Sequence, residues 1–104
     1  MIPESFKCAG HTIKVEICDE LPNNRYGAFH DVPCVIKIAR TLFDEDFGKV
    51  QLTEQQMMNT FCHELIHCFQ FFYGTKMYET EAQVYANFLQ EFINTKCQYG
   101  KRNF

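Results

Sequence analysis

Cys62-His63-Glu64-Leu65-Ile66-His67-Cys68 is the stretch from which the rest of the chain is best understood. His63 and His67 are four residues apart, so on an α-helix they lie one above the other on the same face. Two imidazoles in that position can converge on one metal ion. Glu64 lies about 100° further round the helix, within reach of a water molecule bound to the metal. The spacing therefore predicts two metal ligands with a carboxylate beside them.

This order of residues is the H-E-x-x-H pattern, in which two His bind zinc and the Glu is the general base of a metallopeptidase. Three fixed residues also occur by chance, in helices that bind no metal. Two further observations decide between these interpretations. The pattern has to lie inside a helix, and a third ligand has to be available.

Length and composition limit the possible classes of protein. A chain of 104 residues predicts one domain, 1–104, and a hydrophobic content of 46% is typical of a globular fold. The net charge of −3 offers no electrostatic attraction for nucleic acid. There is no apolar run of the roughly 18 residues that a membrane helix needs, and the N-terminal residues do not resemble a signal peptide. We therefore expect a cytoplasmic monomer with no nucleic-acid or membrane partner.

The six cysteines are expected to be free thiols. Their even number favours disulfides, but the absence of a signal peptide argues against them. No C-x-x-C pair is present, which argues against a structural zinc site made of cysteines. Cys62 and Cys68 lie on faces of one helix about 120° apart and are poorly placed to bridge each other. We interpret the cysteines as small buried hydrophobic residues.

Alternating hydrophobic residues in the first part of the chain predict a small sheet over 12–40. Ile13, Val15 and Ile17 lie on one face of the first strand. The three segments with strand character are 12–17, 25–29 and 34–39. A hairpin connection is expected at 31–33, so the sheet should be antiparallel or mixed, with one face covered.

A long helix follows this sheet. The segment 41–51 is acidic but lacks the ligand spacing of a calcium loop, so we expect a solvent-exposed connector there. Thr53 and Gln56 form a capping box, and Gly74 is the next residue that stops a helix, which predicts a helix over 54–73. Its expected buried side consists of Met58, Phe61, Cys62, Leu65, Cys68, Phe69 and Phe72. The H-E-x-x-H pattern thus lies inside a helix, at the edge of its buried side.

A second helix is expected over 79–95. Its hydrophobic residues at helical spacing are Ala82, Val84, Tyr85, Phe88, Leu89 and Phe92. We interpret this stripe as core. Glu81 lies at the start of the helix, one turn before Tyr85.

The third metal ligand is expected to be a carboxylate. A catalytic zinc usually has three protein ligands and one open position. No His follows His67, and the carboxylates that do follow it are Glu79, Glu81 and Glu91. A short loop can fold the second helix back antiparallel to the first, and Glu81 would then face the two His. We favour Glu81 over Glu79, which is two residues away and points elsewhere on a helix.

These features resemble those of a minimal gluzincin-type zinc metallopeptidase. The run Glu79-Thr80-Glu81-Ala82-Gln83-Val84-Tyr85-Ala86 is also similar to the ImmA/IrrE-like metallopeptidases of bacteria and phages. The resemblance covers roughly 12–93, but only the two helices are specific. It implies one catalytic Zn²⁺ held by His63, His67 and Glu81, with Glu64 as the general base.

Two positions depart from this resemblance. Larger gluzincins often have an Asp four residues after the ligand Glu, where it orients the first His. Here that position is Tyr85, so this support has to come from elsewhere. The residue that stabilises the oxyanion also has no clear match, and the candidates are Tyr73, Tyr78, Tyr85 and His30.

We therefore expect an α+β, zincin-like fold, in which a three-stranded sheet packs on two helices with the zinc between them. The expected function is that of a zinc metallopeptidase, most simply an endopeptidase. A zinc-activated water would attack the peptide bond with Glu64 as general base. An edge of the sheet within 26–39 could hold an extended peptide substrate. The alternatives are a non-catalytic or self-blocked zinc-binding module on the same scaffold, and a metal-free interaction domain.

Overall fold

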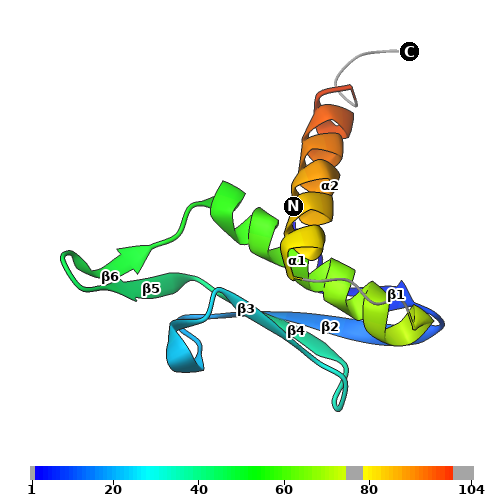
Figure 1. Ribbon diagram of the computed structural model, residues 1–104, viewed down its shortest axis with the longest axis horizontal. Coiled ribbons are helices and arrows are strands. Elements are labelled where there is room, and N and C mark those ends of the chain that lie inside the picture. Colours follow the sequence, from blue (N-terminus) through cyan, green and yellow to red (C-terminus); the bar gives the residue numbers. More distant parts are fainter. Residues whose placement is uncertain (1, 75–78, 100–104) are drawn as a thin grey trace.

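The computed structural model describes residues 2–74 and 79–99, and these ranges form an α+β fold with two α-helices and two small sheets (Figure 1). The strands are β1 (Ser5–Cys8), β2 (His11–Cys18), β3 (Gly27–His30), β4 (Val35–Ala39), β5 (Thr41–Asp44) and β6 (Gly48–Gln51). The helices are α1 (Glu54–Tyr73) and α2 (Glu79–Tyr99), and a 3-10 turn spans Pro22–Asn24. No helix in the described ranges has the length and apolar character needed to cross a membrane. The predicted mixed α+β class is confirmed.

The larger sheet has the strand order β1-β2-β4-β3. β2 and β4 form a parallel central pair, with Val15 opposite Ile36, and β1 and β3 are added antiparallel at the two edges. The mixed sheet and the hairpin that joins β3 to β4 agree with the prediction. β1 is an additional strand. It was not predicted because four residues are too few to show a convincing alternation.

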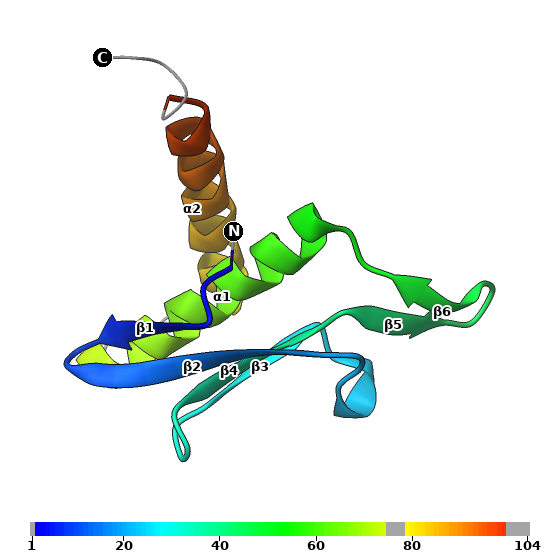
Figure 2. The same cartoon turned by 180° about the vertical axis from the view of Figure 1, so that it is seen from behind.

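The segment 41–51 is not the connector that was predicted. β5 and β6 pair antiparallel in a second, two-stranded sheet, which projects away from the larger one (Figures 1 and 2). The acidic run forms its turn, because the Asp44 carboxylate accepts hydrogen bonds from the backbone N–H groups of Asp46 and Phe47 at 2.8 and 3.0 Å. Gly48 follows with a φ of 74°, a conformation that favours glycine. The acidic residues thus act as turn residues.

α1 lies across one face of the larger sheet and contacts β1, β3 and β4 (Figure 2). It runs over the predicted residues because both of its ends are well defined. Thr53 and Gln56 make both hydrogen bonds of the capping box, and Gly74 is left-handed at the C-cap. Phe69 departs from the prediction, since it is exposed. The core consists of Ile13, Ile36, Ile38, Met58, Phe61, Cys62, Cys68 and Ala86.

α2 packs against α1 and rises away from the sheet (Figure 1). Ala82 and Ala86 are fully buried in this contact, and their small side chains let the helices approach closely. Leu89 and Ile93 of α2 are partly buried against the core. The interface also contains a hydrogen-bonded set of amides, which we call the amide network: Gln55, Asn59, Gln83, Asn87, Gln90 and Asn94. The prediction that the hydrophobic stripe is core is wrong for most of its members. The exposed ones are Val84, Tyr85, Phe88 and Phe92.

The cysteines with described side chains are free thiols, as predicted. Cys62 and Cys68 are fully buried, whereas Cys8, Cys18 and Cys34 are partly buried. Burial raises the pKa of the Cys62 thiol to about 11. Burial, together with a hydrogen bond to Cys8, raises the pKa of Cys68 to about 12. Both thiols are therefore protonated and poorly nucleophilic at neutral pH.

Candidate metal centre

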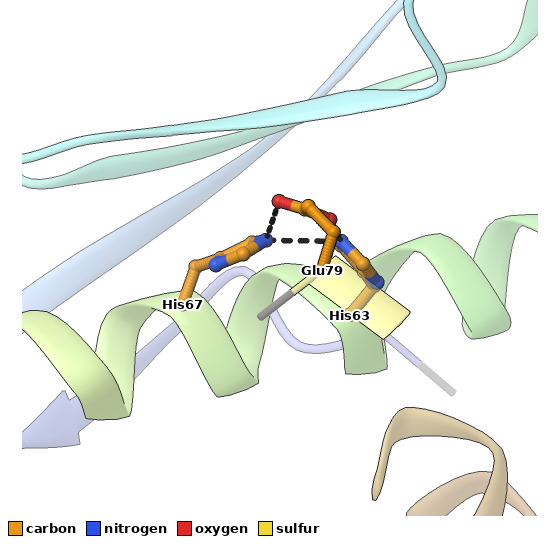
Figure 3. Close-up of side chains that lie close together, drawn as sticks. All are labelled: His63, His67 and Glu79. Atoms are coloured by element: carbon orange, nitrogen blue, oxygen red, sulfur yellow. Dashed lines mark hydrogen bonds and ion pairs between the residues drawn. The ribbon is translucent and has the colours of Figure 1, made fainter. Parts of the chain in front are cut away.

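α1 and the first residue of α2 bring His63, His67 and Glu79 together (Figure 3). The Nε2 atoms of the two His are 2.9 Å apart. The Glu79 carboxylate lies across both rings, with Oε2 at 2.9 Å from Nε2 of His63 and Oε1 at 2.9 Å from Nε2 of His67. One potential ligand atom from each residue thus lies within 4.8 Å of the others. Within the described part of the chain, this cluster could hold a metal ion.

The structure does not bring Glu81 to the two His, and Glu79 lies there instead. Two residues on a helix are about 200° apart, so only one of these carboxylates can face α1. Both carboxylates are exposed, and the Glu79 side chain is 73% exposed. Glu79 lies in line with the buried Ala82, one turn later, whereas Glu81 lies on the other side of α2, in line with the exposed Tyr85. The expectation for Glu81 depended on treating Tyr85 and the residues in line with it as core. Because that stripe is exposed, the helix is turned the other way.

The hydrogen bond of His67 fixes which of its nitrogens can bind a metal. His67 Nδ1 is 2.8 Å from Oε1 of Gln70. That oxygen can only accept, so Nδ1 carries the proton and donates it. Nε2 of the neutral ring then presents a lone pair towards Glu79 and His63. Converging lone pairs repel each other unless a proton or a cation lies between them, so this donor set fits a bound metal ion.

His63 lacks a comparable partner. Its Nδ1 is buried and has no hydrogen-bond partner among the described residues. If Nε2 binds a metal, Nδ1 carries the proton and is an unsatisfied donor, which costs about 1–3 kcal/mol. The sequence already indicated a gap here, because Tyr85 replaces the Asp that often orients the first His. Tyr85 is exposed and offers no such support.

Glu64 is the buried carboxylate beside this cluster, with 7% of its surface exposed. Its burial raises the pKa of the carboxyl above the usual range, and Glu79 adds to the rise. The charges of His67, His63 and Arg25 act in the opposite direction. A carboxylate with a raised pKa is a stronger base, and it sits one residue from a candidate metal ligand.

Gly27 explains how Glu64 becomes buried. A Cβ atom at Gly27 would lie 2.5 Å from Cγ2 of Thr60 and 3.3 Å from Cγ of Glu64. The backbone of β3 can therefore rest on α1 at this point only because Gly27 has no side chain. A glycine within a strand pattern weakens the prediction of a strand, but it also indicates a close approach of the backbone, as Gly27 shows here.

An open cleft of about 1050 Å³ lies between β3 and the two helices, and it contains the cluster and Glu64. Of the residues considered for oxyanion stabilisation, Tyr73, Tyr85 and His30 do not line it, and Tyr78 lies outside the described residues. Arg25 and Tyr26 do line it. The sequence did not single them out, because no motif marks the residues that lead into a short strand.

The cluster can act chemically in two ways. Two imidazoles and a carboxylate are donors for a divalent metal ion of intermediate softness. Without a metal, a protonated His would form an ion pair with Glu79. Comparisons of the chain with protein-family models, with curated proteins and with solved structures give no match. The choice between the two states therefore depends on the site itself.

Proposed function

We propose that this protein is a small zinc-dependent peptidase with a zincin-like site. His63, His67 and Glu79 would bind the metal, and Glu64 would act as the general base. The observation that supports this most is that three donor atoms from two helices converge in an open cleft, beside a buried carboxylate. Two His and one Glu that leave a fourth position open are a known ligand set of catalytic zinc. Glu79 thus takes the role that the family resemblance implied for Glu81.

The residues of the cleft have separate roles in this proposal. Zinc, when bound, supplies a Lewis acid that polarises a peptide carbonyl and makes water more acidic. Glu64 accepts the proton of the attacking water and passes it to the leaving amine. Gly27 holds the backbone of β3 against Glu64 and so keeps bulk water from this carboxylate. Gln70 holds His67 in the tautomer that leaves Nε2 free to bind.

The substrate is proposed to lie along β3, which is an edge strand of the described sheet. The N–H of Ala39 donates to the carbonyl of Tyr26 at 2.8 Å. By antiparallel alternation, the backbone groups of Gly27 and Phe29 point away from β4, towards the open edge. An extended peptide can pair with these groups as an added strand. N-methylation of substrate amides, one at a time, should reduce cleavage at least about tenfold at alternate positions. Equal tolerance at all positions would exclude strand addition.

Metal content and cleavage measured together test the proposed function. The purified chain should bind one zinc per molecule and cleave members of a peptide library. Glu64→Gln should retain the zinc, because Glu64 is not a ligand, and should reduce kcat by about 10²–10⁴-fold. Glu54→Gln is the matched control, since Glu54 is an exposed residue of the same helix. It should cleave as the unmodified chain does.

Three results would contradict the proposal. Stoichiometric zinc without cleavage of any peptide would favour the non-catalytic or self-blocked module. No bound zinc, even after addition of excess zinc, would leave His63, His67 and Glu79 as an ion-paired cluster between two helices. Undiminished cleavage by Glu64→Gln would remove Glu64 from the mechanism.

A further inference from the structure

Among the described residues, Arg25 is the only Lys or Arg that lines the cleft. Besides the two His, the other charged residues that line the cleft are Glu64 and Glu79. Both carboxylates belong to the proposed catalytic site. No carboxylate of the described residues lies within ion-pair distance of Arg25. Within the described part of the chain, its guanidinium group makes no hydrogen bond or ion pair, although its charge lowers the pKa of Glu64. Such a group can bind a carboxylate through two parallel hydrogen bonds.

The position of Arg25 along the cleft follows from the strand that it leads into. Arg25 has an extended backbone, and the pairing with β4 already begins at Tyr26. Alternate residues of an extended segment share a face, so Arg25 lies on the same side as Gly27 and Phe29. That side faces α1, because Gly27 rests on Glu64 and the ring of Phe29 contacts Phe71 and Phe72.

The distance to the reacting centre argues for a role in substrate selection. A strand advances about 3.3 Å per residue, so Arg25 lies roughly 6–7 Å along the strand from Gly27, which marks the position of Glu64. A peptide paired with β3, with its scissile bond near Glu64, would have a residue about two positions from that bond next to Arg25. At this separation, a side chain or chain end of the peptide beside Arg25 lies within reach of the Arg25 side chain.

We propose that Arg25 is a specificity-determining residue that binds a carboxylate of the substrate, about two residues from the cleaved bond. This inference rests on the proposed peptidase function. The carboxylate can come from an Asp or Glu side chain or from the C-terminus of the peptide. Either source meets the same guanidinium group, and a neutral amide in the same place loses the charge-assisted hydrogen bonds.

The test uses the zinc-loaded full chain and matched peptides. One set has Asp or Glu, and the other Asn or Gln, at each position within three residues of the cleaved bond. Each peptide is made with a free and with an amidated C-terminus. At one position, the unmodified chain should have a kcat/KM at least about tenfold higher for the acidic peptide than for its amide counterpart. The difference should lie in KM. If amidation alone removes the preference, the carboxylate is the C-terminus. If substitution of the acidic residue removes it, the carboxylate is a side chain.

Variants of Arg25 separate selection from a structural role. Arg25→Gln should remove the preference, so that acidic and neutral peptides are cleaved with the same kcat/KM, while zinc content and the unfolding temperature stay unchanged. Arg25→Glu should reverse the preference. Arg40→Gln, which alters an exposed cation outside the cleft, should keep it. A preference that survives in Arg25→Gln, or no preference in the unmodified chain, overturns the inference.

Peptide binding decides the inference independently of turnover. The same peptides, carrying a fluorophore, are titrated against zinc-loaded Glu64→Gln with and without Arg25→Gln, and their anisotropy is measured. A preference for the carboxylate peptides that needs Arg25 supports the inference even if no peptide is cleaved, in which case only the proposed catalysis fails. Equal binding of acidic and amide peptides overturns the inference, even if cleavage is found.

Discussion

The two helices differ in how much apolar surface they bury. α1 places apolar side chains such as Met58, Phe61 and Cys62 on the sheet and forms much of the core. α2 buries two alanines, part of Leu89 and Ile93 and part of the amide network, and it leaves its larger apolar residues such as Phe88 exposed. Periodicity therefore identified which residues share a face in both helices. It identified the buried face only in α1, where the fold offers an apolar sheet to cover it.

The difference between the helices has a direct consequence for the site. The face of α2 that packs on α1 also determines which carboxylate reaches the two His. Had the apolar stripe of α2 been buried, Glu81 would have turned inwards. Because α2 packs through its alanines, Leu89, Ile93 and the amide network instead, Glu79 turns inwards. The buried face of one helix thus selects the candidate metal ligand.

The largest expected effect is on stability, from matched Phe truncations in the two helices. Phe61→Ala should reduce the free energy of unfolding by about 3–5 kcal/mol, because Phe61 is buried and its ring contacts that of Phe6. Phe88→Ala should change it by less than about 0.5 kcal/mol, since Phe88 is mostly exposed. Urea denaturation of both variants provides the measurement. Similar losses in the two variants would mean that the outer face of α2 is covered after all.

The next effect concerns the metal. Glu79→Ala should weaken zinc binding by more than about 100-fold, because loss of a ligand exceeds the effect of losing a supporting residue. Glu81→Ala is the matched control on the opposite side of α2, and its zinc affinity should be unchanged. Competition with a chromogenic chelator measures both affinities. The reverse result would mean that α2 is turned with its apolar stripe inwards, as the sequence alone suggested.

The sequence was most informative where local chemistry determines the structure. The capping box at Thr53 and the glycine at position 74 define the ends of α1, and helix spacing alone places His63 and His67 together. Glu79 could not be chosen in this way, because it depends on how two helices pack through polar groups. The same limit applies to Arg25 and Gly27, whose importance arises from the neighbours that the fold brings to them.

A smaller effect is expected in the amide network, which takes the place of some of the apolar packing between the helices. Asn59 donates to Asn87 at 2.9 Å and to Gln90 at 2.8 Å, and it accepts a hydrogen bond from Gln83 at 3.0 Å. Asn59→Ala should destabilise the fold by about 1 kcal/mol, because water can replace only part of these interactions. Asn94→Ala should have almost no effect, because Asn94 donates to Oε1 of Gln55 only at a long distance of 3.5 Å. Equal effects of the two variants would show that the network does not hold α2 in place.

The smallest effect concerns Glu64, the buried carboxyl group of α1. Burial raises its pKa in the folded protein, so folding favours the protonated form. The stability that this proton contributes is complete below the pKa of the unfolded chain and is lost as the pH rises through the pKa of the folded one. At pH 7, above the pKa of this carboxyl in the unfolded chain, the metal-free fold has lost part of this stabilisation, and Glu64→Gln should unfold a few degrees higher than the unmodified chain.

This gain should disappear below about pH 4, where the carboxyl is protonated in both states. Glu54→Gln, which alters an exposed carboxylate in the first turn of α1, should show no such gain at either pH. Melting curves of the metal-free proteins at the two pH values provide the test. A Glu64→Gln variant that is less stable than the unmodified chain at pH 7 would mean that the carboxylate is held by favourable interactions. Glu64 would then be a structural residue of α1, and not a general base whose burial destabilises the fold.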